Sequence, residues 1–309
     1  MKKEGTFISK DERTRIHYIM SYPKNEENIK GIIQIAHGLK ENISIYDEVT
    51  EFFCERGFLV IINDHLGHGH SIESSNELGH FKNKDSISIL VEDMHTVMKK
   101  GKAEHDNIPY FLIGHSFGSF LSRIFAGLYG KELNGLILCG TGNPSTKNLK
   151  KALKVLKLMS ITKKPDYRSK KIEKTQLISY CSKIENPKNF YEWISRDEKI
   201  VEPYLKNPLN NFTYTLNGYS NILYAALHMQ EEEILKNTPN NMPIFILSGA
   251  DDPVGYYGEK VKEVYDLYKN NNVEDVTIKL YEGARHCILT ELNKDEVRLD
   301  LINWIMKRI

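Results

Sequence analysis

Short, uninterrupted apolar runs alternate along most of the chain with segments whose apolar residues recur at helical spacing. The runs are too short for helices and are bounded by glycine, proline or polar residues, so we expect strands buried on both faces. These expected strands cover residues 31–37, 58–62, 109–114, 134–139, 242–247 and 276–281. Helical patterns lie at about residues 45–56, 85–101, 257–270 and 294–307, and a polar loop covers 63–84. This alternation predicts an α/β fold with a doubly wound, mostly parallel sheet.

Two segments depart from the alternation. Residues 5–9 and 15–21 alternate apolar and polar positions around a polar turn, which predicts an antiparallel hairpin. Residues 143–238 carry helical patterns and loops without an apolar run typical of a buried strand. We therefore expect one α/β core formed by residues 1–142 and 239–309. The segment 143–238 is expected to be a helical cap inserted over the carboxyl ends of the strands.

The expected strand at 109–114 leads into Gly114-His-Ser-Phe-Gly118, after which a helical pattern begins. A serine between two glycines at a strand-to-helix turn is typical of a nucleophile elbow, because a side chain at either glycine would collide with its neighbours. The turn lifts the hydroxyl above the sheet edge, and the first N–H groups of the helix point toward any oxyanion formed there. Ser116 is therefore the candidate nucleophile.

An acid and a histidine follow Ser116 in the order that would activate it. Asp251 and Asp252 lie just past the end of one expected strand, and His286 lies in the loop after the next. A shift of one residue turns a side chain the other way, so we choose Asp252 and expect Asp251 to bond the local turn. Ser116 would attack an acyl carbon, His286 would move the proton, and Asp252 would orient the imidazole.

An oxyanion formed at Ser116 needs two backbone N–H donors. One is expected to be the N–H of Phe117, directly after the nucleophile. The other is expected from the loop after the first central strand, His37-Gly38-Leu39, as the N–H of Leu39.

Five motifs occur in the order found in one known family. They are His37-Gly38, Asn63-Asp-His-Leu-Gly-His-Gly-His-Ser71, Gly114-His-Ser-Phe-Gly118, Gly249-Ala-Asp-Asp-Pro-Val254 and the segment from Glu282 to Glu291. With them, the chain resembles the monoacylglycerol lipase and lysophospholipase-like family of α/β-hydrolases, which also includes serine aminopeptidase-type sequences. The resemblance implies an α/β-hydrolase fold with a helical cap. It also implies hydrolysis of monoacylglycerols, lysophospholipids or similar monoacyl esters through an acyl-enzyme, without a cofactor.

Three positions differ from the family pattern. Leu66 stands where an arginine is usual, Cys287 where a glutamate is usual, and Asn42 where a histidine is usual. None of them is one of the three expected catalytic residues, so the differences bear on substrate preference.

Composition narrows the possible partners and compartment. The 309 residues carry a net charge near +1, which argues against nucleic acid as the main partner. The first residues lack the apolar run of a secretory signal, and no stretch approaches the roughly 20 apolar residues of a membrane span. The cysteines are scattered without CxxC spacing, so we expect reduced thiols in a cytoplasmic protein. They are Cys54, Cys139, Cys181 and Cys287.

Several alternatives remain open. The histidines at 65, 68, 70 and 80 have a spacing similar to that of metallo-hydrolases, but the resemblance implies structural roles for them, and we expect no metal. An amide or peptide hydrolase such as a proline aminopeptidase would need acidic residues to hold the substrate amine, and Glu231-Glu-Glu233 is the candidate. A hydrolase-fold protein that binds a ligand with little turnover is the third alternative.

The segment from Lys147 to Met159 predicts an amphipathic helix with a lysine face and an apolar face. It has two interpretations: peripheral docking on anionic lipid surfaces, or a solvated lysine face over an apolar stripe packed on the core. We favour the second. Aromatic and aliphatic residues of the cap are suited to line the apolar acyl tunnel that we expect there, or equally to form the core of the cap. They are Phe190, Tyr191, Trp193, Phe212, Tyr214, Tyr219, Leu223 and Tyr224.

Overall fold

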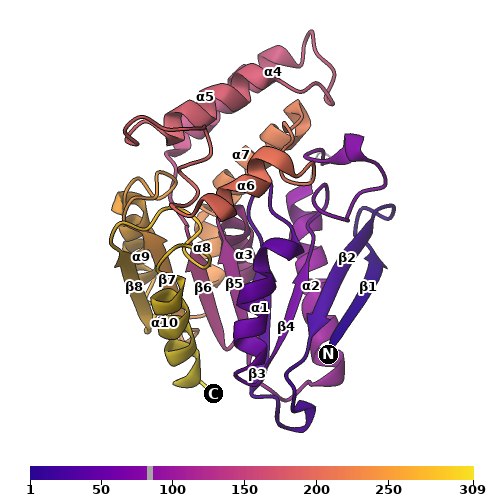
Figure 1. Cartoon of the computed structure of the whole chain (residues 1–309), viewed down its shortest axis with the longest axis vertical. Coiled ribbons are helices and arrows are strands. Elements are labelled where there is room, and N and C mark those ends of the chain that lie inside the picture. The colour runs from indigo at the N-terminus through magenta and orange to yellow at the C-terminus, as the bar shows by residue number, and fades with distance from the viewer. Residues whose placement is uncertain (82–85) are drawn as a thin grey trace.

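A sheet of eight strands forms the centre of the protein in the computed structural model, which describes residues 1–81 and 86–309 (Figure 1). The strand order is β1-β2-β4-β3-β5-β6-β7-β8, and β3 to β8 are parallel. The hairpin of β1 and β2 is antiparallel and joins the sheet beside β4. The strands are β1 (Lys2–Ile8), β2 (Arg15–Ser21), β3 (Gly31–Ala36), β4 (Phe58–Asn63), β5 (Tyr110–His115), β6 (Gly135–Cys139), β7 (Ile244–Gly249) and β8 (Val276–Tyr281).

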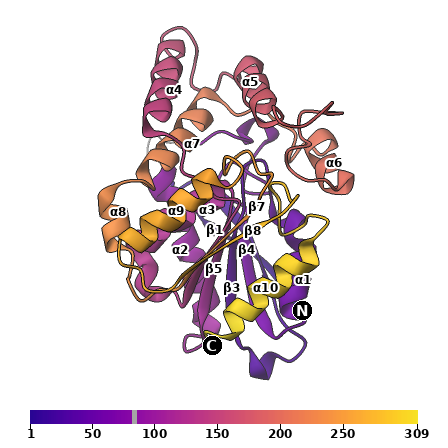
Figure 2. The ribbon, with the colours of Figure 1, turned by 90° about the vertical axis from the view of Figure 1, so that its left-hand side faces the viewer.

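The central strands are buried on both faces because helices cover each side (Figure 2). Successive residues point to opposite faces of a strand, so Ile32 and Leu112 join one apolar core while Ile33 and Ile113 join the other. The first core lies under α2 (Ser86–Glu104), α3 (Phe117–Tyr129) and α9 (Glu259–Asn270). The second lies under α1 (Asp47–Cys54) and α10 (Lys294–Met306).

The predicted α/β fold with a mostly parallel sheet is confirmed, and the differences lie at the ends of elements. Strand β7 begins at Ile244 rather than at residue 242, since Pro243 has no N–H to donate to a ladder. The predicted helix at 45–56 is a 3₁₀ turn (Ile43–Tyr46) followed by α1. The end of the expected loop at 63–84 and the first residue of the expected helix at 85–101 lie outside the described residues.

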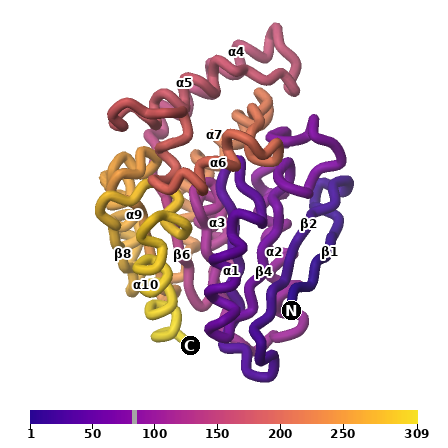
Figure 3. Tube along the Cα trace, in the orientation of Figure 1, coloured from indigo at the N-terminus to yellow at the C-terminus, as the bar shows by residue number. Residues whose placement is uncertain are grey.

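The helices between β6 and β7 lie mainly above the carboxyl ends of the strands, while both termini lie at the opposite end of the molecule (Figures 1 and 3). The last of them, α8, returns to the sheet. It packs against α3 so closely that a Cβ on Gly127 would lie 2.6 Å from the carbonyl oxygen of Ile234. The helices are α4 (Thr146–Met159), α5 (Lys170–Tyr180), α6 (Glu198–Lys206), α7 (Leu216–His228) and α8 (Glu232–Asn237). We propose residues 143–238 as an insertion in a single α/β core. None of the helices in the described residues has the length and apolar character that crossing a membrane requires.

Candidate active site

Ser116 occupies a strained turn between β5 and α3. Its φ of 53° is unusual for a residue with a side chain, and its N–H donates to the carbonyl of Cys139 on β6 at 2.9 Å. A Cβ on Gly118 would lie 2.0 Å from the carbonyl oxygen of Ala36, and one on Gly114 would lie 2.6 Å from that of Gly118. Both glycines are therefore required by close backbone approach, as the elbow motif predicts. The turn leaves Ser116 partly exposed at the end of a fully buried strand.

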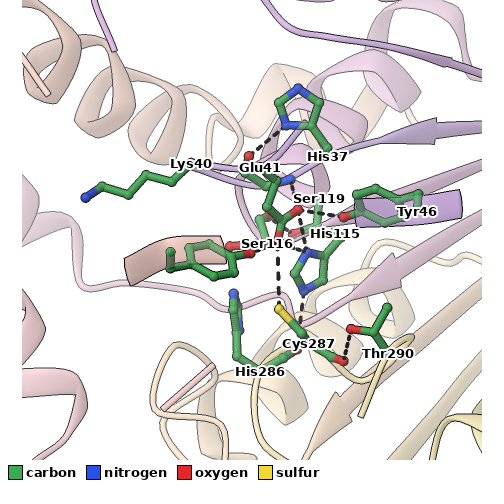
Figure 4. Close-up of polar contacts among 12 residues, drawn as sticks. His37, Lys40, Glu41, Tyr46, His115, Ser116, Ser119, His286, Cys287 and Thr290 are labelled. Atoms are coloured by element: carbon green, nitrogen blue, oxygen red, sulfur yellow. Dashed lines mark hydrogen bonds and ion pairs between the residues drawn. The ribbon is translucent and has the colours of Figure 1, made fainter. Parts of the chain in front are cut away.

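Asp252 and His286 come together beside this turn. Asp252 follows β7 and is fully buried, and its Oδ2 lies 2.9 Å from Nδ1 of His286, in the loop after β8. The carboxylate also accepts a hydrogen bond from the Val254 N–H at 2.8 Å and one from the Ser248 hydroxyl at 3.1 Å. Figure 4 shows the imidazole of His286 pointing toward Ser116.

Asp251 has a different environment from its neighbour. It is exposed, and its N–H donates to the carbonyl of Ala284 at 2.9 Å. The structure therefore places Asp252, and not Asp251, against the histidine. The directions of the two side chains follow from the turn after β7, which the apolar pattern of the strand does not specify.

The loop from His37 to Leu39 lies against the nucleophile. A Cβ on Gly38 would be 2.8 Å from the Cβ of Ser116, so this residue too is required by close approach. Within the described residues, the N–H groups of Leu39 and Phe117 donate to no other protein group. Phe117 is the first residue of α3, so its N–H also lies at the positive end of a helix dipole.

His65 and His68 pack against His37 in this loop. The rings of His37 and His65 lie 4.2 Å apart between centroids, and Nε2 of His37 accepts the His65 N–H at 2.9 Å. Burial lowers the pKa of His65 to about 3 and that of His68 to about 4, so both are neutral at physiological pH. Among the described residues, the group of side chains close enough to hold a metal ion contains none of these histidines. Nε2 of His68 lies 2.7 Å from the hydroxyl of Tyr214. The two ring nitrogens of His65 are buried and have no hydrogen-bond partner in the part of the chain that the structure describes.

The cap contacts the catalytic loops directly. The ring of Trp193 lies 5.0 Å from that of His286, and the Cys287 N–H donates to the carbonyl of Ile194 at 2.8 Å. Lys40, beside Leu39, forms an ion pair with Glu173 of α5, and its ammonium donates to the hydroxyl of Tyr191 at 2.9 Å. No local sequence pattern indicates a role for this lysine, because its partners lie more than a hundred residues further along the chain.

The residues suited to an acyl tunnel differ in their burial. Tyr191, Tyr214 and Tyr219 are buried, whereas Phe190 and Tyr224 are exposed by 44% and 50%. Phe190 and Tyr224 are therefore not part of a buried cap core, and the acyl tunnel stays a prediction.

A pocket of about 540 Å³ adjoins the histidine loop. Arg285 and Asp251, the chain neighbours of His286 and Asp252, form part of its wall. The remaining lining residues are Tyr180, Lys183, Ile184, Glu185 and Tyr257. Four of the seven lining residues carry charged side chains, so the pocket does not have the apolar lining expected of an acyl tunnel.

A sheet of this topology, with a serine at the turn between its central strand and the following helix, defines an α/β-hydrolase. The family model described as "Serine aminopeptidase, S33" matches residues 27–293, and the chain belongs to this family. It is therefore a serine hydrolase.

Individual relatives agree with this assignment. The monoglyceride lipase of Rattus norvegicus is 26% identical over 293 residues, which cover 93% of this chain and 86% of that protein. The monoacylglycerol lipase of Mycolicibacterium smegmatis is 22% identical over 91% of this chain and 89% of its own length. The crystal structure of a thermostable carboxyl esterase from Bacillus coagulans superposes with a TM-score of 0.89, at 31% identity and 99% and 98% coverage of this chain and that chain. The resemblance stated from the motifs is confirmed.

Proposed function

We propose that the protein is a serine ester hydrolase that cleaves monoacylglycerols, lysophospholipids or similar monoacyl esters through an acyl-enzyme. The observation that carries the proposal is the Asp252–His286 hydrogen bond of 2.9 Å beside a serine held at a φ of 53°. The monoglyceride lipase, monoacylglycerol lipase and carboxyl esterase relatives support the choice of ester substrates.

The proposed mechanism begins with the tautomer of His286. Because Asp252 is an acceptor, Nδ1 carries the proton and Nε2 has a free lone pair to remove the proton of the Ser116 hydroxyl. The serine oxygen attacks the ester carbonyl, and the oxyanion accepts hydrogen bonds from the N–H groups of Leu39 and Phe117. His286 then protonates the leaving alcohol, and a water molecule activated by the same imidazole releases the fatty acid from Ser116.

The structure gives little support to an amide or peptide hydrolase. The acidic run Glu231-Glu-Glu233 is exposed at the start of α8, beside the sheet. Glu231 lies 2.8 Å from His228, and Glu232 forms an ion pair with Lys236 at 2.6 Å. Two of the three acids are thus paired within their own segment, so the run is poorly placed to hold a substrate amine at Ser116.

We expect hydrolysis of p-nitrophenyl esters and no comparable hydrolysis of aminoacyl p-nitroanilides. The ester activity should peak at one acyl-chain length, because a binding passage of fixed depth gains apolar contact until it is filled. Initial rates for acetyl to palmitoyl esters, measured beside a panel of anilides that includes proline, would test this. Faster turnover of an anilide than of every ester would favour the peptidase, and a folded protein inactive on both would favour a ligand-binding role.

The cap tip supports a second, finer proposal, peripheral contact with lipid surfaces. Residues 147–174 hold eleven lysine or arginine residues and two acidic residues. The apolar stripe of α4 packs inward through Leu149 and Leu156, in line with the interpretation that we favour. Other apolar residues are nevertheless exposed beside the lysines: Val155 by 54%, Leu158 by 66% and Ile161 by 76%. Exposed apolar groups among cations are typical of an interfacial segment.

Reversing four cap charges should weaken binding to anionic vesicles by at least about tenfold, since each lysine near such a surface contributes about 1 kcal/mol. The quadruple variant combines Lys150→Glu, Lys151→Glu, Lys154→Glu and Lys157→Glu. Co-sedimentation with phosphatidylglycerol vesicles measures the effect. A matched variant reverses four exposed lysines outside the cap tip and should bind like the wild type. It combines Lys131→Glu, Lys236→Glu, Lys262→Glu and Lys269→Glu. Equal binding by both variants would exclude docking through the cap tip.

A further inference from the structure

Directly beneath the loop that carries Leu39 lies a buried pair of titratable residues that the proposed mechanism does not use. Glu41 and His115 are each 2% exposed, and Nδ1 of His115 lies 3.0 Å from Oε1 and 3.1 Å from Oε2 of Glu41 (Figure 4). On the other side of the ring, Nε2 lies 3.2 Å from the carbonyl oxygen of His286. The ring therefore bridges a carboxylate and the backbone of the catalytic histidine.

The partners of His115 determine its protonation state. A carboxylate and a backbone carbonyl can only accept hydrogen bonds, so both ring nitrogens must carry a proton, and the ring is an imidazolium. Burial alone would lower the pKa of His115, but the charge of Glu41 raises it well above its usual value. Burial alone would raise the pKa of Glu41, but the His115 charge and hydrogen bonds, including one from Tyr46, lower it far below its usual range.

A metal site is the alternative interpretation of this cluster, because Glu41, His115 and Cys287 bring ligating atoms close together. The hydrogen bonds argue against it. The carboxylate of Glu41 already accepts from the Gly38 N–H at 2.6 Å, the Tyr46 hydroxyl at 2.6 Å and the Tyr204 hydroxyl at 3.1 Å. Burial raises the pKa of the Cys287 thiol to about 11, so a thiolate ligand is disfavoured. Protons, not a metal, satisfy these groups.

The pair joins the segments that supply the proposed chemistry. The carboxylate of Glu41 accepts a hydrogen bond from the N–H of Gly38, the residue before Leu39. This bond fixes the loop that carries the first proposed oxyanion donor. His115 directly precedes Ser116, and its Nε2 holds the backbone of His286. Tyr204, on α6, brings the cap to the same carboxylate.

We propose that Glu41 and His115 are positioning residues, a buried ion pair that holds the oxyanion loop and the backbone of the catalytic histidine in register with Ser116. The catalytic part of this inference rests on the proposed function, whereas the ion pair itself does not. A buried charge that loses its partner is costly, so either residue without the other should leave the loops displaced. Displacement of reacting groups by about 1 Å can lower turnover by about 100-fold.

Nuclear magnetic resonance of ¹⁵N-histidine-labelled wild type tests the ion pair directly, with His115→Gln used to assign the signals. We expect both ring nitrogens of His115 to carry protons at pH 8. The other titratable groups facing the ring are Cys287, the His286 imidazole with its centroid 4.9 Å away, and the Tyr46 ring. A neutral His115 ring at pH 8 would overturn the proposal, whether or not the enzyme hydrolyses esters.

Glu41→Gln tests the positioning role. We expect kcat on the preferred ester to fall by about 10- to 100-fold with KM within about threefold, since the oxyanion contacts form in the transition state. A trifluoromethyl ketone, whose adduct with serine carries an oxyanion, should lose affinity by a similar factor, while the matching methyl ketone should not.

Glu132→Gln is the matched control. Glu132 pairs with His95 at 2.8 Å, between α2 and the chain before β6, and its loss should leave kcat unchanged. If Glu41→Gln lowered the melting temperature but left kcat per folded molecule and ketone affinity unchanged, the pair would be structural only, and the positioning role would be excluded. If the wild type hydrolysed no ester, the proposed function would be wrong. The magnetic resonance measurement would still decide whether His115 and Glu41 form an ion pair.

Discussion

Ser116→Ala is expected to lower kcat for ester hydrolysis by about 10⁶-fold, because the other groups of a triad contribute little once the nucleophile is lost. The fold should survive. Alanine has the smaller side chain, and the turn is held by backbone contacts of Gly114 and Gly118 rather than by the serine hydroxyl. Steady-state hydrolysis of the preferred p-nitrophenyl ester, together with labelling by a fluorophosphonate, measures the loss.

Ser122→Ala provides a control on the same helix. Ser122 is fully buried on α3, and its hydroxyl has no hydrogen-bond partner in the part of the chain that the structure describes. Removing it should leave kcat within about twofold of wild type, because no partner is left unsatisfied. Retention of fluorophosphonate labelling in Ser116→Ala would show that another residue is the nucleophile.

Asp252→Asn should reduce kcat by about 10⁴-fold, the second-largest effect that we expect. An asparagine amide in place of the carboxylate would favour the His286 tautomer with its proton on Nε2, and that tautomer cannot accept the proton of Ser116. The change is nearly isosteric, so the hydrogen bond from the Val254 N–H can persist and the turn after β7 should keep its shape.

Asp251→Asn makes the same chemical change one residue earlier. Its side chain is exposed, so kcat should stay within about threefold of wild type. Measuring both variants on one ester across pH 5 to 9 compares the two aspartates under the same conditions. A larger loss in Asp251→Asn than in Asp252→Asn would reverse the proposed assignment.

The elements that the sequence predicts well are those whose environment is uniform along their length. Strands β3, β4 and β5 are buried on both faces, so an unbroken apolar run identifies them, and the glycines at 114 and 118 locate the elbow. The choice of Asp252 rested on turn chemistry, and the structure places that residue against His286. The predicted ends of elements were less accurate where a single backbone group sets the boundary. Strand β7, for example, begins after Pro243, which has no N–H to donate.

The supporting contacts of the site could not be predicted in the same way. In the sequence, Glu41 is separated from His115 by 74 positions and from Cys287 by 246. No local pattern relates residues that are so far apart. The charge of His115 could not be predicted, because it depends on two acceptors that are not its sequence neighbours. The ion pair of Lys40 with Glu173 depends on how the cap seats over the core, which amphipathic periodicity within α5 does not specify.

The positions of β5 and β8 in the sheet determine the order in which activity and the folded core are lost on heating. Ser116 follows β5, which has a strand on each side, whereas His286 follows β8, the last strand of the sheet, which pairs with β7 alone. Edge elements open at lower free energy than the centre of a sheet. Thermal inactivation should therefore precede global melting. The protein in that interval would retain an ordered nucleophile without its base, and cooling should restore activity without refolding of the core.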